Sequence, residues 1–365
     1  MFSDPYSHVG KPAATAPRLQ AELGRLTGLV PGLVLALAAT LAAYGLSAAV
    51  GGPVMLYAII VGMALNPVLH GPATKAGIQF SAKTILNIGV ALLGVKIALA
   101  DIAGLGWETA ALVMVCVGGT ILSGIGVGRL LGLKSEHAVL SSGAVAICGA
   151  SAAMALCAAL PQTTEEARKE SERNTLVTVM GVTLLGTFAM VLYPALAHIL
   201  GLSETQAGIF IGATIHNVAQ VVGAGFMISE PVGDTATIVK LMRVACLVPV
   251  IAIVTLAYRR RASAASAGRD DGSSKAKPAL VPSFLIGFIA LVAINSLGLI
   301  PAALTAILSD VSSYALVMAI AALGVKTSVS EMFKVGGSAC LILVVQTVLL
   351  AAVALSAVLL VPAFA

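Results

Sequence analysis

The stretch IFIGATIHNVAQVVGAG, residues 209–225, places imidazole and amide groups inside an otherwise apolar run. Polar side chains are costly in a bilayer, so such a group indicates a bundle interior or a ligand site. Small and polar residues recur at helical steps along one face, namely Gly212, His216, Gln220 and Gly223, and Thr214 and Asn217 lie beside them. We expect the segment to unwind near Gly223 and to bind substrate there, as broken transporter helices do. The alternative is tight helix packing, with His216 and Gln220 hydrogen-bonded across an interface.

A second interruption lies in SSGAVAICGASAAM, residues 141–154, where Cys148, Gly149 and Ser151 break an apolar run. If the helix breaks near Gly149, the second half begins with free N–H groups and the positive end of a helix dipole. Such an end binds anions without a charged side chain. A seam of small residues that packs against another helix is the alternative.

The charges within the apolar segments are basic. No carboxylate lies near the middle of an expected segment; those closest are at segment ends, namely Asp101, Glu108, Asp310 and Glu331. Lys240 and Arg243 lie one turn apart in TIVKLMRVACLVPV, whereas Lys96 and Lys326 lie near helix ends, where basic side chains snorkel. Cations, amides and helix N-termini together fit an anionic substrate, and we expect Lys240 and Arg243 to attract it along its access path.

Enzyme and nucleotide-binding motifs are missing. SGIGVG, residues 123–128, follows no strand, and the sequence contains no Walker-type phosphate loop. His216 has no triad partners in order and no second His four residues on, so neither nucleophilic catalysis nor a metal site is expected. Aromatic residues are only 4% of the chain and no basic stripe accompanies them, so nothing supports nucleic-acid binding and none is expected. We therefore expect that the protein is not an enzyme and that it binds no cofactor.

The elements that position these groups are membrane helices. The chain has 365 residues, 59% of them hydrophobic, and apolar runs of about 20 residues recur from residue 29 onward. We predict an all-α polytopic membrane protein with about 11 transmembrane helices, because the alternating segments of a β-barrel are absent. The expected segments are 29–49, 53–69, 84–100, 109–131, 138–160, 175–200, 206–227, 237–257, 281–299, 312–329 and 337–362.

A polar, basic linker at residues 258–279 divides one transporter domain into a first part, 29–257, and a second part, 280–365. The positive-inside rule puts this linker in the cytoplasm together with the N-terminal segment 1–28, and the C-terminus outside. Loops with Lys75, Lys134 and Lys334 then also fall inside. The basic loop Thr163–Arg173 falls outside, against the rule. Either its acidic residues offset its basic ones, or a helix nearby is miscounted.

Two stretches echo one another, LLGVKIALADI at residues 92–102 and ALGVKTSVSEM at residues 322–332. They occur on expected helices an odd number apart, which therefore run in opposite directions through the membrane. A weaker echo links residues 82–93 with residues 235–247 in a different register. Inverted repeats of this kind are typical of secondary transporters.

The segments AICGASAA, IHNVAQVVGAG, SAKTILNIGVALLGVKIAL and TIVKLMRVACLVPV resemble the YeiH-type family of bacterial inner-membrane proteins, which are labelled sulfate exporters. The resemblance covers roughly residues 28–362. It implies a fold similar to the bile-acid–sodium symporter and sodium–proton antiporter superfamily: two inverted repeats, a panel, a core, and two broken helices that cross near the midplane. An acid commonly follows the His in the family pattern, whereas this chain has Asn217.

These observations predict a multi-pass transporter in a bacterial inner membrane that moves small anions, sulfate or a sulfonate-like or carboxylate compound, by alternating access. The expected substrate site comprises Cys148, Gly149 and Ser151 with Thr214, His216, Asn217, Gln220 and Gly223. His216 would act as a polar ligand or a proton-sensitive switch. A sodium- or proton-coupled importer of organic anions and a passive anion channel are the alternatives. Expected partners are the anion and the lipid bilayer, and a homodimer is left open.

Overall fold

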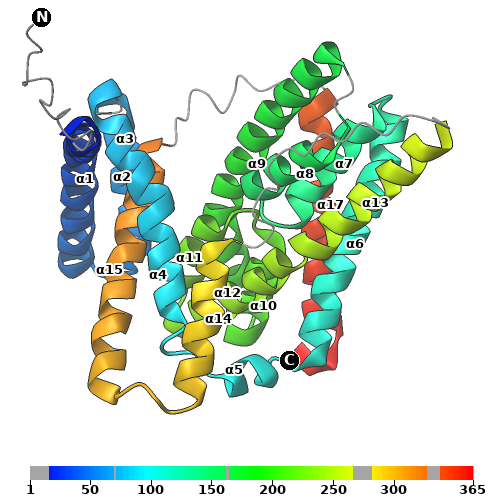
Figure 1. Ribbon diagram of the computed structural model, residues 1–365. Coiled ribbons are helices and arrows are strands. Elements are labelled where there is room, and N and C mark those ends of the chain that lie inside the picture. The colour runs from blue at the N-terminus through cyan, green and yellow to red at the C-terminus, as the bar shows by residue number, and fades with distance from the viewer. Residues whose placement is uncertain (1–15, 70, 162–163, 266–281, 327–337, 365) are drawn as a thin grey trace, which may run out of the picture.

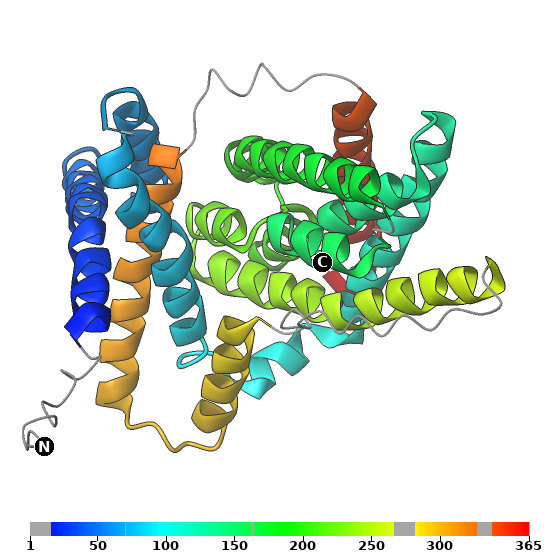
Figure 2. The same cartoon turned by 45° about the horizontal axis from the view of Figure 1, so that its top comes forward.

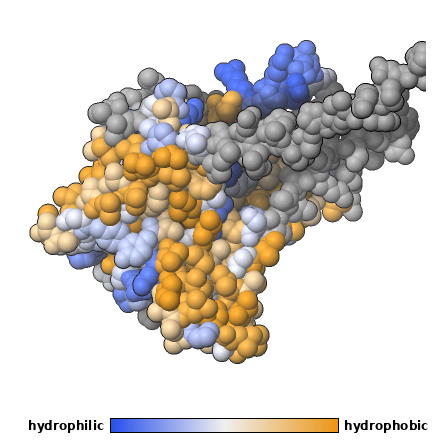
Figure 3. Space-filling view, turned by 60° about the vertical axis from the view of Figure 1, so that its left-hand side comes forward, coloured by the Kyte–Doolittle hydropathy of each residue, from blue (hydrophilic) through white to orange (hydrophobic). Residues whose placement is uncertain are grey.

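The computed structural model describes residues 16–69, 71–161, 164–265, 282–326 and 338–364. Every regular element in these ranges is helical, and seven helices are long and apolar enough to cross a membrane. Large apolar side chains such as Leu41, Leu122 and Leu192 are more than half exposed. Much of the surface in Figure 3 is accordingly hydrophobic, as expected of side chains that face lipid. The prediction of an all-α polytopic membrane protein is confirmed.

The helices form two groups that stand side by side (Figures 1 and 2). In the first group α15 packs against α2 and α4, α1 packs against α2 and α3, and α14 packs against α4. The close approach of α15 to α2 requires glycine, since a Cβ on Gly62 would collide with the backbone of Ala321. The helices of this group are α1 (Ala16–Val50), α2 (Val54–Leu69), α3 (Pro72–Phe80), α4 (Leu86–Leu93), α14 (Ser283–Ser296) and α15 (Ala302–Lys326), with a π-helical turn, Ser81–Ile85, joining α3 to α4.

The second group holds the polar segments. Here α12 packs against α10 and α11, and α17 packs against α6, α9 and α10. The short α5 (Leu99–Gly104) leads into it. Its helices are α6 (Gly106–Leu130), α7 (Ser135–Ala146), α8 (Ala150–Ala159), α9 (Glu165–Ile199), α10 (Glu204–Thr214), α11 (Val218–Phe226), α12 (Glu230–Ala245), α13 (Leu247–Ala265) and α17 (Ser338–Leu360).

The pair α7 and α8 folds back on itself as a re-entrant hairpin, which we call the first hairpin. Lys134, which precedes α7, forms an ion pair of 2.5 Å with Glu170, which follows α8 on the first turns of α9. Midway along the arms, Gly143 of α7 packs against Leu156 of α8. Both ends of the hairpin therefore lie on one side of the protein, at the top of Figure 1.

The pair α10 and α11 forms a second hairpin that enters from the opposite side. Ser229, which follows α11, donates a hydrogen bond of 2.6 Å to Glu204 in the first turn of α10. The two ends of this hairpin are therefore also adjacent, at the bottom of Figure 1. Its second arm, α11, is the hairpin arm that contacts the first group of helices, through α2 and α15.

The hairpins correct the expected membrane topology. The segments expected at 138–160 and 206–227 enter and leave on one side, so two of the eleven expected transmembrane helices do not cross. A run of about 20 apolar residues fits either a crossing or a hairpin, because both bury the backbone hydrogen bonds. Because α7 and α8 form a hairpin, the loop around Glu170 lies on the same side as Lys134 and not on the expected opposite side. The basic loop then falls on the side that the expected topology assigns to the cytoplasm, in agreement with the positive-inside rule, and the sides expected for the loops after α11 are unchanged.

Several expectations fall partly outside the described residues. Most of the linker at 258–279 and the loop with Lys334 are among them, as is the second half of the echo at 322–332. At the N-terminus, α1 already begins at Ala16, ahead of the expected boundary at residue 29. The inverted repeat and the division into two parts stay predictions.

Candidate functional site

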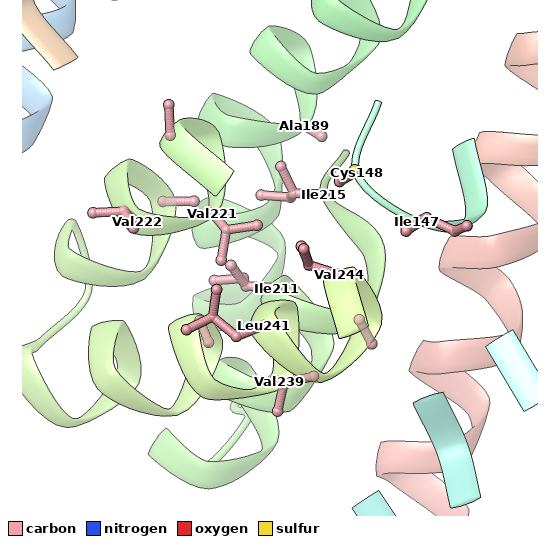
Figure 4. Close-up of a cluster of buried hydrophobic side chains, with 14 of the residues drawn as sticks. Ile147, Cys148, Ala189, Ile211, Ile215, Val221, Val222, Val239, Leu241 and Val244 are labelled. Carbon is pink, nitrogen blue, oxygen red and sulfur yellow. The ribbon is translucent and has the colours of Figure 1, made fainter. Parts of the chain in front are cut away.

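The two hairpins meet at their loops, residues 147–149 and residues 215–217. Gly149 has a φ of +65°, a conformation that favours glycine, and it precedes the first residue of α8. A Cβ at this position would collide with the Oδ1 atom of Asn217 in the other loop. Figure 4 shows Ile147 and Cys148 on the first loop and Ile215 on the second. The contact brings together residues nearly 70 positions apart in sequence.

The break at Gly149 is confirmed, whereas the break expected near Gly223 lies elsewhere. The helix is interrupted between Thr214 and Val218, and Asn217 is the N-cap of α11. Gly223 lies within α11, where its missing side chain makes room for Met190 and Ile320. This glycine therefore serves close packing, a common use of glycine in membrane helices.

The second arms begin at the loops and direct their positive ends there. The first N–H groups of α8 and α11 have no partner within their own helix, since helical bonding starts at Ala153 and Val221. Ser151 in the first turn of α8 is exposed, and Asn217 is partly exposed. Two helix N-termini and two polar side chains that are not fully buried thus lie at the loops, an arrangement that favours an anion.

The first arms end at the same loops with their negative ends, and Lys240 of α12 lies against both. Its Nζ atom donates to the carbonyl oxygen of Ile147 at 2.7 Å and to that of Ile215 at 2.8 Å. One ammonium group therefore joins the loops of the two hairpins through main-chain atoms. The side chain of Lys240 is fully buried.

Arg243, one turn further along α12, binds further carbonyl groups near the ends of the first arms. Its Nη2 donates to Val145 O at 2.8 Å and its Nε to Ala146 O at 2.9 Å, both at the end of α7. Its Nη1 donates to Ile215 O at 3.2 Å and to Gly212 O at 3.4 Å. Arg243 is also fully buried.

The expected access path for Lys240 and Arg243 is therefore corrected, because both lie beneath the loops and neither is exposed. A cation inside a bilayer needs several acceptors, and the C-terminal carbonyl groups of two half-helices supply them. The six ion pairs found among the described residues include neither cation.

The amide and imidazole side chains hold the second hairpin in place. His216 is fully buried, and its Nε2 atom lies 2.9 Å from the hydroxyl oxygen of Thr347 on α17. Gln220 donates to Thr183 O at 2.8 Å and to Thr187 Oγ1 at 3.0 Å, both on α9. This is the interface bonding that the sequence left as an alternative.

Other residues of the expected site differ in their access to the loops. Asn217 donates to Gln220 Oε1 at 3.1 Å and keeps some exposure. Thr214 is buried and its hydroxyl bonds Phe210 O within α10. Cys148 is buried beside the first turn of α8. The structure thus brings Cys148, Gly149, Ser151 and Asn217 together at the loops, and places the other expected residues behind them or along the arms.

Sequence reasoning missed the partners of the polar groups. The partners are the main-chain oxygen of Thr183 and the hydroxyl groups of Thr187 and Thr347, and both hydroxyl groups also bond a carbonyl one turn earlier in their own helix. Threonines are common in membrane helices and give no distinctive pattern.

A second missed feature joins the two groups of helices at the far side from the first hairpin. Lys96, which follows α4, pairs with Glu230 at 2.6 Å and with Asp234 at 3.0 Å, both on α12. Its Nζ atom also lies 5.4 Å from the ring centre of Phe226. Lys96 was expected to snorkel; its side chain is 15% exposed and is bound across the interface instead.

A cavity of about 280 Å³ opens at the base of the first hairpin, away from the loops. It is lined by α7, by Leu160 and Pro161 after α8, and by α9, including His137, Glu170 and Asn174. The loop residues 147–149 do not line it, so this cavity is a separate feature of the outer end of the hairpin.

The chain resembles known membrane proteins along most of its length. The family model described as Conserved hypothetical protein 698 matches residues 27–344. UPF0324 membrane protein TauZ of Paracoccus denitrificans is 46% identical over 329 residues, 90% of this chain and 94% of that protein. UPF0324 membrane protein CT0845 of Chlorobaculum tepidum is 43% identical over 343 residues, 93% of this chain and 92% of that protein.

A third relative, UPF0324 membrane protein RB0971 of Rhizobium meliloti, is 44% identical over 321 residues, 88% of this chain and 90% of that protein. No solved structure matches the chain significantly. With a family model and full-length relatives in agreement, the chain belongs to the UPF0324 family of membrane proteins, the YeiH-type family that its motifs resemble.

Proposed function

We propose that this protein is a secondary transporter of small anions, sulfate or a sulfonate-like compound, that works by alternating access with its substrate at the two hairpin loops. One observation carries the proposal: Lys240 and Arg243 are fully buried beside these loops, and no ion pair among the described residues includes either of them. The carbonyl groups satisfy the hydrogen bonds of these cations but carry no net charge, and a bound anion would supply the counter-charge that a buried cation favours in a bilayer.

The net charge of the groups around the loops is positive, which favours an anion. Each half-helix end carries roughly half an elementary charge, negative for the first arms and positive for the second arms. These four ends cancel one another, so the charges of Lys240 and Arg243 remain, about +2 in total. A doubly charged anion such as sulfate would neutralise the site, and a singly charged sulfonate or carboxylate would do so in part.

The groups that would bind the anion lie on the exposed side of the loops. The first N–H groups of α8 and α11, the hydroxyl of Ser151 and the amide of Asn217 are donors for anionic oxygens. His216 would contribute indirectly, because its bond to Thr347 fixes the second loop against α17.

The two hairpins also suggest how access alternates. They enter from opposite sides and meet at Gly149 and Asn217, so each is a separate barrier between the site and one solution. Displacement of one hairpin, or of the second group of helices relative to the first, would open the site to one side at a time. Transporters with discontinuous helices place their substrates at such interfaces. A passive anion channel, the alternative, would need both barriers open at once.

The test is the uptake of labelled sulfate by proteoliposomes that contain the purified protein. Uptake is measured with a sodium gradient, with a pH gradient and with neither. We expect gradient-driven or exchange-driven sulfate uptake that Ser151→Ala reduces. Ser313→Ala, which removes an exposed hydroxyl on α15, is the matched control and should leave uptake unchanged.

Unlabelled methanesulfonate and small carboxylates, added as competitors, would rank the substrate class. Uptake that never exceeds equilibrium and needs no exchange would instead favour a channel. Transport of every tested anion that survives both Ser151→Ala and Asn217→Ala would refute a site at the loops.

A further inference from the structure

The carbonyl groups at the ends of the first arms converge on a single point from two different elements. Ile147 O at the end of α7 and Ile215 O at the end of α10 lie 2.7 and 2.8 Å from the same nitrogen atom, Lys240 Nζ. In transporters with broken helices, unwound carbonyl groups and half-helix C-termini are the groups that coordinate a coupling sodium ion. Here an ammonium group of the chain itself occupies that position.

We propose that Lys240 is a resident cation that takes the place of a coupling cation at the hairpin loops, so that the protein moves its anion without sodium. This inference rests on the proposed anion transport, because it specifies how the same site is coupled. It makes Lys240 a positioning residue that joins the two loops, and not a ligand of the transported anion.

The neighbouring contacts leave little for a mobile cation to bind. Arg243 takes Val145 O and Ala146 O at the end of α7 and shares Ile215 O with Lys240. Both cations come from α12, which packs against α10 and α11. A sodium ion would first have to displace the ammonium group, which the chain itself holds against Ile147 O and Ile215 O.

Removal of the ammonium group tests the idea directly. Lys240→Ser removes the ammonium group from the carbonyl groups of Ile147 and Ile215, so that a sodium ion can take its place. Lys240→Arg keeps a cation there, and Lys326→Ser removes an exposed lysine at the end of α15 as the matched control. All are measured on the purified full-length protein in detergent, as the apparent melting temperature in sodium chloride and in choline chloride at equal ionic strength.

Ligand binding to the folded state raises the melting temperature, so the sodium-against-choline difference reports a sodium site without any substrate. We expect no difference for the wild type, Lys240→Arg and Lys326→Ser. Lys240→Ser should melt lower than the wild type in choline and regain part of the loss in sodium. If Lys240→Ser does not yield folded protein, the wild type and Lys240→Arg still decide the question.

A melting temperature or a sulfate exchange rate of the wild type that rises in sodium would overturn the inference. So would Lys240→Ser that melts like the wild type in both salts, or that melts lower and shows no sodium response. The proposed function fails separately: absence of transport for all anions, with melting behaviour as expected, would refute the transport assignment while the resident cation stands.

Discussion

The contact between the two hairpin loops predicts that Gly149→Ala is damaging. Its φ of +65° with ψ of −118° is strained for any residue with a Cβ, at a cost of about 1–3 kcal/mol. The new methyl group would also collide with Asn217 Oδ1, and overpacking of this kind costs about 1–3 kcal/mol. The combined destabilisation is therefore about 2–6 kcal/mol, which lowers the melting temperature by roughly 3–8 °C if unfolding is cooperative.

The assay is the apparent melting temperature of the purified protein in detergent, with sulfate exchange in proteoliposomes as a second readout. Gly118→Ala on α6 is the control, because a Cβ there meets nothing within 4 Å. Alanine also favours a helix more than glycine does, so this variant should be as stable as the wild type or slightly more stable.

A double variant separates the two costs. Asn217→Ala in the Gly149→Ala background removes the collision but not the backbone strain, so part of the stability should return. If Gly149→Ala melts within a degree or so of Gly118→Ala, the loops do not touch as described. If the double variant loses more stability than the two single variants lose together, the collision is not the cause.

Three further predictions concern the supports of the site. Arg243→Ala leaves Val145 O, Ala146 O and Gly212 O without their side-chain donor, while Lys240 still binds Ile147 O and Ile215 O. At about 1–3 kcal/mol for each buried acceptor left unpaired, the variant should lose about 3 kcal/mol or more, enough to abolish a monodisperse peak in size-exclusion chromatography, whereas Arg243→Lys should retain part of the peak. Thr347→Val removes the partner of His216 and should destabilise the protein by about 1 kcal/mol in the same melting assay. Lys96→Gln breaks the ion pairs between the two groups of helices and should cost about 1 kcal/mol, a difference from the wild type that shrinks as salt is raised. Unchanged melting temperatures for these variants would contradict the described contacts.

Much of the fold could be predicted because the bilayer constrains it strongly. Long apolar runs had to become helices, since no other open structure satisfies the backbone in lipid. The break at Gly149 was also predictable, because small and hydroxyl-bearing residues interrupt an apolar run there. The second break was misplaced, because glycine serves both helix breaks and helix packing, and sequence does not say which.

The hairpins could not be predicted from the sequence, for a related reason. A crossing and a hairpin of the same length have the same hydropathy, and only the ion pair of Lys134 with Glu170 and the bond of Ser229 to Glu204 reveal where each pair of helices ends. The basic loop before α9 carried a hint, because its charge disagreed with the expected topology.

The sequence by itself determined that this is an all-α membrane protein of the UPF0324 family, with a basic and carboxylate-poor interior. Only the tertiary structure decided what the basic residues bind. Lys240 and Arg243 donate to main-chain carbonyl groups of two hairpins, and every residue has a carbonyl group, so these partners have no signature in the sequence. Which carbonyl groups are free depends on where helices end and which ends meet, and that is fixed by packing.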